Sequence, residues 1–425
     1  MYPNAITTLV ILTIFVCFLI IVAAKAYKTP LNPMTYYLAF DSGLRVILSC
    51  SLIFFLGIDG FKDADITHAL LLHMLYVFCF SLPFFLKPKS VYAFFSSSVR
   101  CLSLNTPGYK IKKSKFALFL IFCFMIANFL LLAVIGEGGM RWFTDPRTAY
   151  IENKFGAGNF YLFWVWSISF FMAYILYSRK PKSIKDFFKI SPYVLLCLLI
   201  SYFTGSKQNI LIILLLLMFY YTHFIKNIRL IRFAFIGSCL LILFMAIQLI
   251  QGTTDSLTGA LAYFDYFQKT IEFVSRYNEV GPKLGEAFTS SFWGYVPRFI
   301  APDKPIIYGQ LLIQDALYPG AADQGYYPAF SSWSFLYLDF EWVGVVMSGL
   351  FVGCMSWAAY EYFRNNRDNI FAFSMAAQAT LTLYMVPLHG ELYLVMWFIL
   401  QRVMLQPAIR LWGIGIPKPS SSSGT

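Results

Sequence analysis

Charged side chains are scarce in this chain, and their scarcity excludes a soluble globular protein. Asp, Glu, Lys and Arg make up 13% of the residues, whereas hydrophobic residues make up 59% and mean hydropathy is +0.64. Apolar runs of about 20 residues recur along the chain, the length that a helix needs to cross a hydrocarbon core about 30 Å thick. Because lipid offers no partner to an open backbone amide, these runs are expected to be helices.

Motifs of metal, nucleotide and serine chemistry are missing as well. The chain contains no HExxH, no paired CxxC, no Walker loop and no GxSxG, and its four histidines do not cluster. We therefore expect neither a bound metal nor a cofactor. None of the eight cysteines falls in a predicted outer loop, so disulfides and cysteine chemistry are not expected either.

The apolar runs predict an all-α polytopic membrane protein with about 11 transmembrane helices. No basic residue precedes the first run, so we interpret it as a retained anchor rather than a cleaved signal. Residues 1–417 are expected to form a single integral membrane domain, and residues 418–425 a linker or tag remnant. Within the second span, Asp41 and Arg45 are four residues apart and are expected to pair. The predicted spans are 5–24, 34–57, 67–86, 116–135, 160–178, 190–204, 208–225, 232–250, 333–359, 369–386 and 391–411.

Charges are distributed unevenly over the predicted loops. With the N-terminus outside, 21 of the 33 Lys and Arg residues lie in inner loops or at their edges and 10 in outer loops. Acidic residues follow the opposite distribution, with 15 of 21 outside. An excess of Lys and Arg marks the cytoplasmic loops of membrane proteins. The net charge of +12 thus indicates topology and attraction to anionic lipid, and no nucleic acid partner is expected.

Two polar segments interrupt the spans on the outer side, at about 136–159 and 251–332. The longer one is rich in Tyr, Phe and Trp and carries five basic side chains. Aromatic faces beside cationic donors suit a sugar chain attached to a phosphate carrier. Within this segment, residues 259–277 place apolar side chains three or four apart, which predicts an amphipathic helix on the membrane surface. Gly281 and Pro282 are expected to end it.

The turn TGSKQN places Lys207 between two short spans at the outer membrane face. One interpretation is an interfacial lysine whose amine reaches water along its aliphatic stem. The other is a cation held near the free N–H groups of a helix start, which attract anions and would suit the diphosphate of a lipid-linked donor. Arg147, in the shorter polar segment, is a further candidate for the same role.

In the longer segment, prolines accompany Arg298 and Lys304 in the sequence YVPRFIAPDKP. This stretch is either an ordinary solvated loop or a pre-organised clamp, because the guanidinium fork of arginine matches phosphate oxygens. Arg276 either joins the clamp or simply pairs with Glu272 or Glu279 at helical spacing.

Several residues near predicted helix ends are candidates for proton transfer. His389 and Glu391 lie in the outer turn between the last two spans. They either belong to a polar turn that breaks two helices, or take a proton from a sugar hydroxyl. Asp339 and Glu341, at the beginning of the ninth span, are further carboxylate candidates.

Three stretches of the chain resemble the O-antigen polymerase (Wzy-type) family, the oligosaccharide repeat unit polymerases of bacterial envelopes. They are the Gly-Ser-basic turn with its apolar span, GSKQNILIILLLL, the loop motif YVPRFIAPDKP, and the span SFLYLDFEWVGVVMSGLFVG. The resemblance extends from about residue 140 to about residue 400. Lys207 stands where the family usually has Arg, and the turn at His389 and Glu391 stands where it commonly has an Arg-Gly-acid turn.

The resemblance implies a metal-independent glycosyltransferase with a C-type membrane fold. Such an enzyme takes a glycan from undecaprenyl diphosphate and adds it to the next undecaprenyl diphosphate-linked repeat unit, as in lipopolysaccharide O-antigen synthesis. It implies the bacterial inner membrane, with the N-terminus in the periplasm and the C-terminus in the cytoplasm. The implied partners are the lipid-linked oligosaccharide, membrane lipids and a polysaccharide chain-length regulator.

The departing diphosphate of that reaction needs cations, and the attacking hydroxyl needs a base. The candidate diphosphate-binding residues are Lys207, Arg298, Arg276, Arg147 and Lys304. The candidate bases are, in order, Glu391, His389 and Glu272. The candidate sugar-stacking residues are Tyr263, Tyr266, Trp293 and Tyr295.

Three alternatives stay open beside polymerisation: an O-antigen ligase, a flippase or transporter of lipid-linked oligosaccharide, and a structural or assembly subunit. A flippase is expected to line its interior with charges across many spans. Here the predicted spans contain few charges and the polar groups gather at the outer face. That distribution favours a reaction on the outer leaflet.

Overall fold

The computed structural model describes residues 2–56, 60–102, 115–153, 157–250, 266–296, 301–320 and 329–382. Within these ranges every regular element is helical, and eight helices are long and apolar enough to cross a membrane. A helical polytopic membrane protein is thus confirmed. The count of about 11 spans stays a prediction, and the last predicted span, 391–411, lies outside the described residues.

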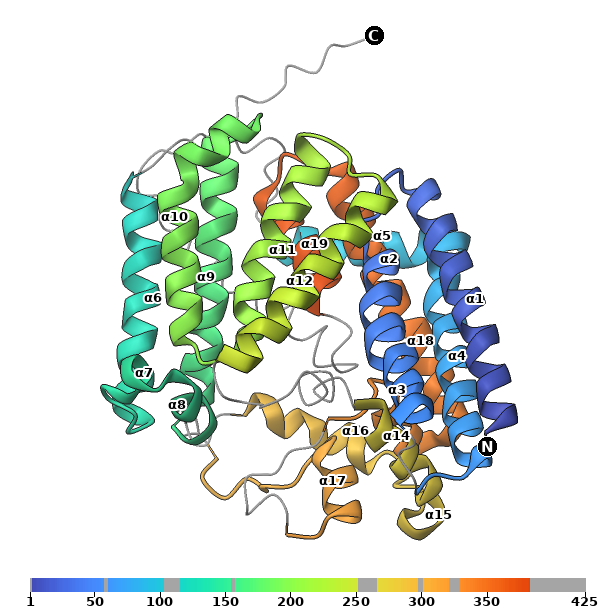
Figure 1. Ribbon diagram of the computed structural model, residues 1–425. Coiled ribbons are helices and arrows are strands. Elements are labelled where there is room, and N and C mark those ends of the chain that lie inside the picture. Colours follow the sequence, from blue (N-terminus) through green and yellow to red (C-terminus); the bar gives the residue numbers. More distant parts are fainter. Residues whose placement is uncertain are drawn as a thin grey trace. The chain divides into compact units, whose positions relative to one another are not determined.

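The helices labelled in Figure 1 belong to two compact units. Unit 1 takes its described residues from 2–88 and 228–357 together with Thr382, and unit 2 from 89–227 and 358–381. The boundary falls inside α18 (Ser334–Asn365). Each unit therefore contains membrane-length helices drawn from distant parts of the sequence.

Unit 1 begins with α1 (Pro3–Ala26) and α4 (Asp63–Leu86), which pack against each other. Between them, the second predicted span is divided into α2 (Pro33–Tyr37), the π-helix η1 (Leu38–Leu48) and α3 (Ser49–Leu56). Hydropathy cannot reveal such a division, because it does not distinguish one helical hydrogen-bond pattern from another. π-Helical turns are rare in proteins, and those that do occur are often found at functional sites.

The π-helix carries the ionisable residues of the second span. Asp41 accepts a hydrogen bond from the Tyr37 hydroxyl at 2.7 Å, and its other carboxylate oxygen lies 3.5 Å from the Arg45 guanidinium. The predicted pairing of Asp41 with Arg45 is thus confirmed. Asp41 and Arg45 thus each have a polar partner, which lowers the cost of placing their charges within a membrane span.

In unit 1, the backbones of α18 and α4 approach each other closely at two glycines of α18. A Cβ on Gly353 would lie 2.3 Å from the Phe80 carbonyl oxygen, and one on Gly349 would lie 2.8 Å from the Cys79 side chain. The two glycines are four residues apart, a spacing that lets membrane helices approach closely. Larger side chains at these positions would force α18 away from α4.

The described part of the longer polar segment also belongs to unit 1, as does α12 (Leu230–Ile250), which corresponds to the eighth predicted span. The regular elements of the longer polar segment are all short. They are α14 (Tyr266–Ser275), α15 (Tyr277–Val280), α16 (Glu286–Ser290), the 3-10 helix η2 (Ser291–Tyr295) and α17 (Leu311–Leu317).

Helix α14 falls within the predicted amphipathic helix, and residues 259–265 of that prediction lie outside the described residues. Its apolar residues Phe267, Ile271 and Val274 are buried, and the helix packs against α3, α4 and η1. Other helices of the unit therefore cover the apolar face that was expected to enter the membrane surface. Helix α14 itself ends at Ser275, before the predicted end at Gly281 and Pro282. Gly281, with a φ of +68°, instead ends the short helix α15 that follows.

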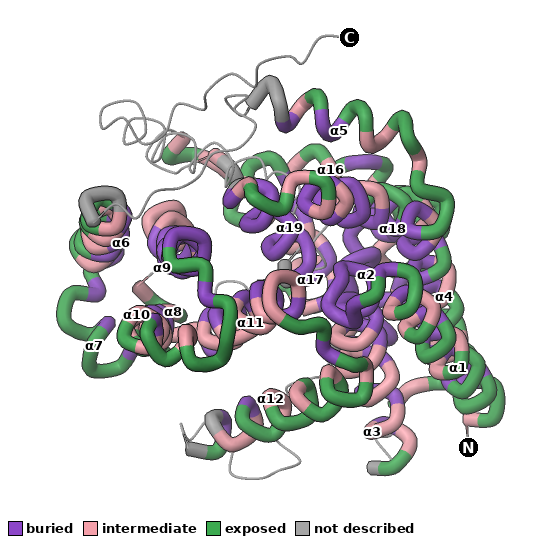
Figure 2. The backbone as a smooth tube through the Cα atoms, turned by 90° about the horizontal axis from the view of Figure 1, so that it is seen from above, coloured by how far each residue is buried: buried purple, intermediate pink, exposed green. Residues whose placement is uncertain are grey.

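Unit 2 is built around α9 (Gly158–Arg179), which is buried along most of its length (Figure 2). Helices α6 (Lys115–Ile135), α10 (Ile184–Phe203) and α11 (Lys207–Phe224) pack against it. Apolar side chains remain exposed on α6 and α10, as expected for helices that face lipid. The other helices of the unit are α5 (Lys89–Leu102), α7 (Arg141–Thr144), α8 (Pro146–Glu152), α19 (Ile370–Thr382) and the end of α18.

Candidate functional site

The turn between α10 and α11, in unit 2, is fixed by hydrogen bonds among its own polar residues. The Thr204 hydroxyl donates to the Ser201 carbonyl at 2.6 Å, and the Asn209 amide donates to the Thr204 hydroxyl at 2.9 Å. The Asn209 amide also donates to Tyr161 OH at 3.1 Å, which itself donates to the Thr204 carbonyl at 3.2 Å. Lys207 begins α11 directly after this turn and is only 9% exposed.

Helix α8 packs against the same turn. Gly205 has a φ of +68°, and a Cβ there would lie 2.1 Å from the Pro146 carbonyl oxygen, so the position needs glycine for two independent reasons. Arg147 donates from Nη1 to the Gly205 carbonyl at 3.5 Å, and its guanidinium lies 5.5 Å from the centre of the Tyr150 ring. The shorter polar segment and the TGSKQN turn thus form one packed corner.

The start of α8 is fixed by Asp145. Its carboxylate accepts a hydrogen bond from the backbone N–H of Thr148 at 3.2 Å, as an N-cap residue does. Hydrogen bonds from Thr148 hold the pKa of Asp145 below its usual range. This N-cap bond fixes the first turn of α8, and Arg147 is the second residue of that helix.

The corner brings together two of the predicted diphosphate-binding residues. Arg147 and Lys207 are distant in the sequence, yet they interact electrostatically as like charges. The N-terminal end of α11 lies at the same place, and a helix start attracts negative charge through its free N–H groups. Two cations at a helix start match the chemistry of an oxygen-rich anion such as a diphosphate.

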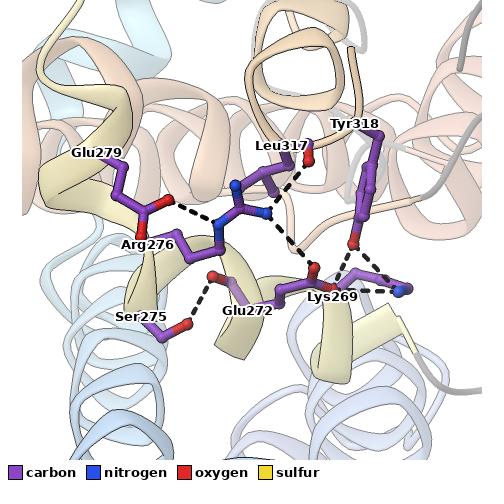
Figure 3. Close-up of polar contacts among 7 residues, drawn as sticks. All are labelled: Lys269, Glu272, Ser275, Arg276, Glu279, Leu317 and Tyr318. Atoms are coloured by element: carbon purple, nitrogen blue, oxygen red, sulfur yellow. Dashed lines mark hydrogen bonds and ion pairs between the residues drawn. The ribbon is translucent and has the colours of Figure 1, made fainter. Parts of the chain in front are cut away.

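A second polar cluster lies in unit 1, between α14 and Tyr318 (Figure 3). Lys269 donates from Nζ to Glu272 Oε2 at 3.2 Å and to the Tyr318 hydroxyl oxygen at 3.1 Å. The Tyr318 hydroxyl donates to the same glutamate oxygen. Burial raises the pKa of Tyr318 to about 12, and its bond to Glu272 adds to the rise. Burial alone would lower the pKa of Lys269, but the bonds to Tyr318 and Glu272 raise it above its usual value.

Arg276 closes the other side of this cluster. Its Nε lies 2.9 Å from Glu279 Oε2, its Nη1 donates to the Leu317 carbonyl at 3.2 Å, and Nη1 lies 4.0 Å from Glu272 Oε1. The hydrogen bond to Glu279 raises the pKa of Arg276. The pairing of Arg276 with neighbouring glutamates is thus confirmed. Together with Lys269, it makes Glu272 the centre of a clamp that ties α14 to the end of α17.

Lys304 is held inside its own loop. Its Nζ donates to the carbonyls of Trp293 at 3.0 Å and Val296 at 2.9 Å, and it lies 5.2 Å from the centre of the Tyr308 ring. The ammonium therefore satisfies carbonyls at the C-terminal end of η2, as a basic side chain does at a helix end. Lys304, which was predicted to bind diphosphate, thus donates hydrogen bonds to carbonyls of its own loop.

Two predicted sugar-stacking residues have described backbone positions only, Tyr266 in α14 and Tyr295 in η2. Trp293, also in η2, is 38% exposed, so part of its ring is accessible for stacking. The predicted site residues that lie outside the described residues are Arg298, His389, Glu391 and Tyr263.

Asp339 and Glu341, the carboxylates at the start of the ninth predicted span, differ in environment. Asp339 is 1% exposed, and its carboxylate accepts hydrogen bonds from backbone N–H groups at the start of α16. Glu341 is exposed at a kink of α18, with a φ of +52°. Asp339 is thus a helix cap, which explains a buried carboxylate without assigning it a reaction.

Two groups of polar residues escaped the sequence prediction. Tyr318 meets Glu272 across a long separation in sequence, so no local pattern could indicate the contact. His73, Ser42 and Trp333 form a buried chain of hydrogen bonds in unit 1. For the group around His73, the only signal in the sequence was a histidine inside an apolar run. An ionisable residue in such a run indicates a polar site within the membrane. Among the described residues, no group of three or more His, Cys, Asp or Glu side chains could hold a metal ion.

The candidate residues are divided between the units. Arg147 and Lys207 belong to unit 2, whereas Glu272, Arg276 and Lys304 belong to unit 1. Comparison with known proteins adds no assignment: no family model, no curated protein and no solved structure matches this chain.

Proposed function

We propose that this protein is a membrane-embedded glycosyltransferase that polymerises lipid-linked oligosaccharide repeat units. It transfers the growing glycan from undecaprenyl diphosphate to the next undecaprenyl diphosphate-linked unit, on the outer leaflet of a bacterial inner membrane. Its N-terminus lies in the periplasm and its C-terminus in the cytoplasm. The resemblance of its motifs to O-antigen polymerases supports the proposal, as does the arrangement of its cations.

The observation that carries the proposal is the convergence of Arg147 with Lys207 at the start of α11. Lys207 alone could be an interfacial lysine, but a second cation lies near it while its own side chain is 9% exposed. Two neighbouring positive charges at one place suit an anion such as a diphosphate. The hydrogen bonds around Thr204 and the close packing at Gly205 hold the two charges in a fixed frame. Such pre-organised charge stabilises a leaving diphosphate without reorganisation at the moment of reaction.

In the proposed reaction, a hydroxyl oxygen of the acceptor attacks the anomeric carbon of the donor glycan. The new glycosidic C–O bond forms as the bond from that carbon to the diphosphate oxygen breaks, and the diphosphate leaves with the electron pair. The proton of the attacking hydroxyl passes to a base, for which Glu391, His389 and Glu272 are the candidates. Arg147 and Lys207 neutralise the charge that develops on the diphosphate.

The direct test uses purified protein in detergent with an undecaprenyl diphosphate-linked repeat unit, and the products are separated on a gel. The proposal predicts a ladder spaced by one repeat unit. A folded sample that makes no ladder from authentic substrate would contradict polymerisation. A single product on an added core-lipid acceptor would instead indicate a ligase, and movement of the substrate across a vesicle membrane without covalent change would indicate a flippase.

Variants then test the residues. Lys207→Ala and Arg147→Ala are expected to abolish the ladder while membrane insertion and folding persist, whereas Lys207→Arg retains activity if charge is what matters. Arg141→Ala is the matched control, because Arg141 lies in the same segment but forms an exposed pair with Glu152 at 2.6 Å. Wild-type ladders from the Lys207→Ala and Arg147→Ala proteins would remove both residues from the mechanism.

A further inference from the structure

His73 is a buried histidine that hydrogen-bonds through both ring nitrogens. It lies on α4 within unit 1 and is 0% exposed. Its Nε2 is 3.0 Å from the Ser42 hydroxyl oxygen, and its Nδ1 is 3.3 Å from the Trp333 indole nitrogen. The ring thus bridges the π-helix η1 and the residue that directly precedes α18.

The identity of the partners determines where the His73 proton lies. An indole N–H can only donate, so Nδ1 of His73 must present its lone pair to Trp333. A neutral imidazole carries one N–H, which then lies on Nε2 and donates to the Ser42 hydroxyl. A doubly protonated ring would direct an N–H of Nδ1 at the N–H of Trp333. The arrangement therefore requires a neutral His73 with its proton on Nε2.

Two further contacts, one of Ser331 and one of His73 itself, connect this bridge to α14. Ser331, two residues before Trp333, donates from its backbone N–H to the Thr270 hydroxyl of α14 at 2.8 Å, and the Thr270 hydroxyl donates to Ser331 Oγ at 3.1 Å. The ring of Phe267, also on α14, lies edge-on to His73 with centroids 6.0 Å apart. Thus η1, α4, α14 and the start of α18 all meet around one imidazole.

We propose that His73, as its Nε2–H tautomer, is a positioning residue for the cluster of Lys269, Glu272 and Tyr318. By fixing Trp333, and with it Ser331 two residues earlier, it holds α14 and the carboxylate of Glu272 in one orientation relative to α4. The positioning role of His73 rests on the proposed function, in which Glu272 is a candidate base. The tautomer and the restraint on α14 rest on the geometry alone.

The first test is nitrogen NMR of the full chain in detergent with ¹⁵N-labelled histidine, a spectrum of only four residues. His73 is expected to show a protonated Nε2 and an unprotonated Nδ1. His223 is an internal reference, because its Nδ1 faces the Phe219 carbonyl at 2.8 Å and must donate there, which leaves Nε2 to accept from Tyr360 OH at 2.9 Å. The two histidines should therefore be opposite tautomers. A protonated Nδ1 on His73 would overturn the proposal.

The second test is hydrogen exchange of the α14 backbone amides, followed by mass spectrometry. His73→Phe removes both bonds and is expected to speed exchange in α14 on the order of tenfold, the effect of losing about 1.4 kcal/mol of local stability. His73→Gln offers one acceptor and one donor and should restore part of the protection. His68→Phe is the control, since His68 is an exposed residue of the same helix. Unchanged exchange in His73→Phe would also overturn the proposal.

These outcomes are separable from those of the polymerase assay. If His73→Phe fails to fold, the tautomer is still measured on the wild-type chain and the exchange on the His73→Gln and Trp333→Phe proteins. In the glycan ladder assay, His73→Phe should lose activity and His73→Gln regain it in part, whereas a wild-type ladder from His73→Phe refutes the positioning role. Failure of wild-type protein to form any ladder removes the proposed function and leaves the tautomer and exchange results standing.

Discussion

Asp339 Oδ2 accepts a hydrogen bond from the backbone N–H of Phe288 at 2.7 Å, and Oδ1 accepts another from Ala287 at 3.1 Å. A carboxylate at the start of a membrane span thus satisfies the free N–H groups of a short helix from the polar segment that precedes the span. The contact fastens α16 to α18 within unit 1. It also shows how a residue that resembles a proton-transfer candidate in sequence can serve the fold.

Replacing Asp339 with alanine is expected to destabilise the protein by about 1–3 kcal/mol, because two backbone N–H groups would lose their buried acceptor. Asp339→Asn keeps one acceptor oxygen and should cost less. The measurement is thermal unfolding of the detergent-solubilised protein. Glu341→Gln, two residues away and exposed, is the control and should leave the unfolding midpoint unchanged. Equal midpoints for Asp339→Ala and wild type would show that the cap contributes nothing.

Gly205→Ala is expected to disrupt the corner that holds Arg147 and Lys207. The new Cβ would lie 2.1 Å from the Pro146 carbonyl oxygen, and the φ of +68° disfavours any side chain. Gly139→Ala separates these effects, because Gly139 also has a positive φ, of +46°, but has open space around it. Limited proteolysis should cut the segment 136–153 faster in Gly205→Ala than in Gly139→Ala. Indistinguishable cleavage of the two variants would argue against close packing at this corner.

Gly353→Ala should destabilise unit 1, whereas alanine in an exposed membrane helix position should not. At Gly353 the added Cβ would meet the Phe80 carbonyl at 2.3 Å, so α18 and α4 must separate. Gly237, in α12, has nothing within 4 Å, and there alanine should stabilise by up to about 1 kcal/mol through its higher helix propensity. Opposite signs of the change in unfolding midpoint are therefore expected for the two variants. A shift in the same direction would contradict the packing seen between α18 and α4.

The stability that Tyr318 contributes is expected to fall at alkaline pH. In the folded protein its pKa is raised to about 12, whereas an unfolded tyrosine has a pKa of about 10. Above about pH 10 the unfolded chain releases a proton that the folded chain keeps, so rising pH favours unfolding. The stability difference between wild type and Tyr318→Phe should be constant below about pH 10 and shrink above it. Tyr202→Phe, at an exposed tyrosine, is the control for general alkaline effects.

Much of the fold could be predicted from sequence, because long apolar runs are a strong and local signal. Eight membrane-length helices correspond to predicted spans, and the pairs Asp41–Arg45 and Arg276–Glu279 follow from helical spacing. The π-helix could not be predicted, because the hydropathy of a segment does not show whether its backbone forms α-helical or π-helical hydrogen bonds. Nor could the position of α14, because an amphipathic pattern does not state whether lipid or protein covers its apolar face.

The candidate site was predictable residue by residue but not as an arrangement. The sequence indicates Lys207 and Arg147 as two separate candidates. Their approach depends on the packing of Gly205 against Pro146, which no local sequence pattern indicates. Lys304 shows the opposite case, a cation suited to phosphate whose bonds go to nearby carbonyls. Residue type and spacing therefore indicate which chemistry is available, whereas tertiary packing decides which groups are used.

The glycine seam between α4 and α18 has a consequence for any lipid that surrounds unit 1. Gly349 and Gly353 bring the two backbones so close that even a methyl group would collide. A hydrocarbon tail has at least the thickness of a methylene chain, so it cannot enter between these helices at that level. The seam is a barrier, and a prenyl tail that reaches unit 1 has to lie along some other surface of its helices.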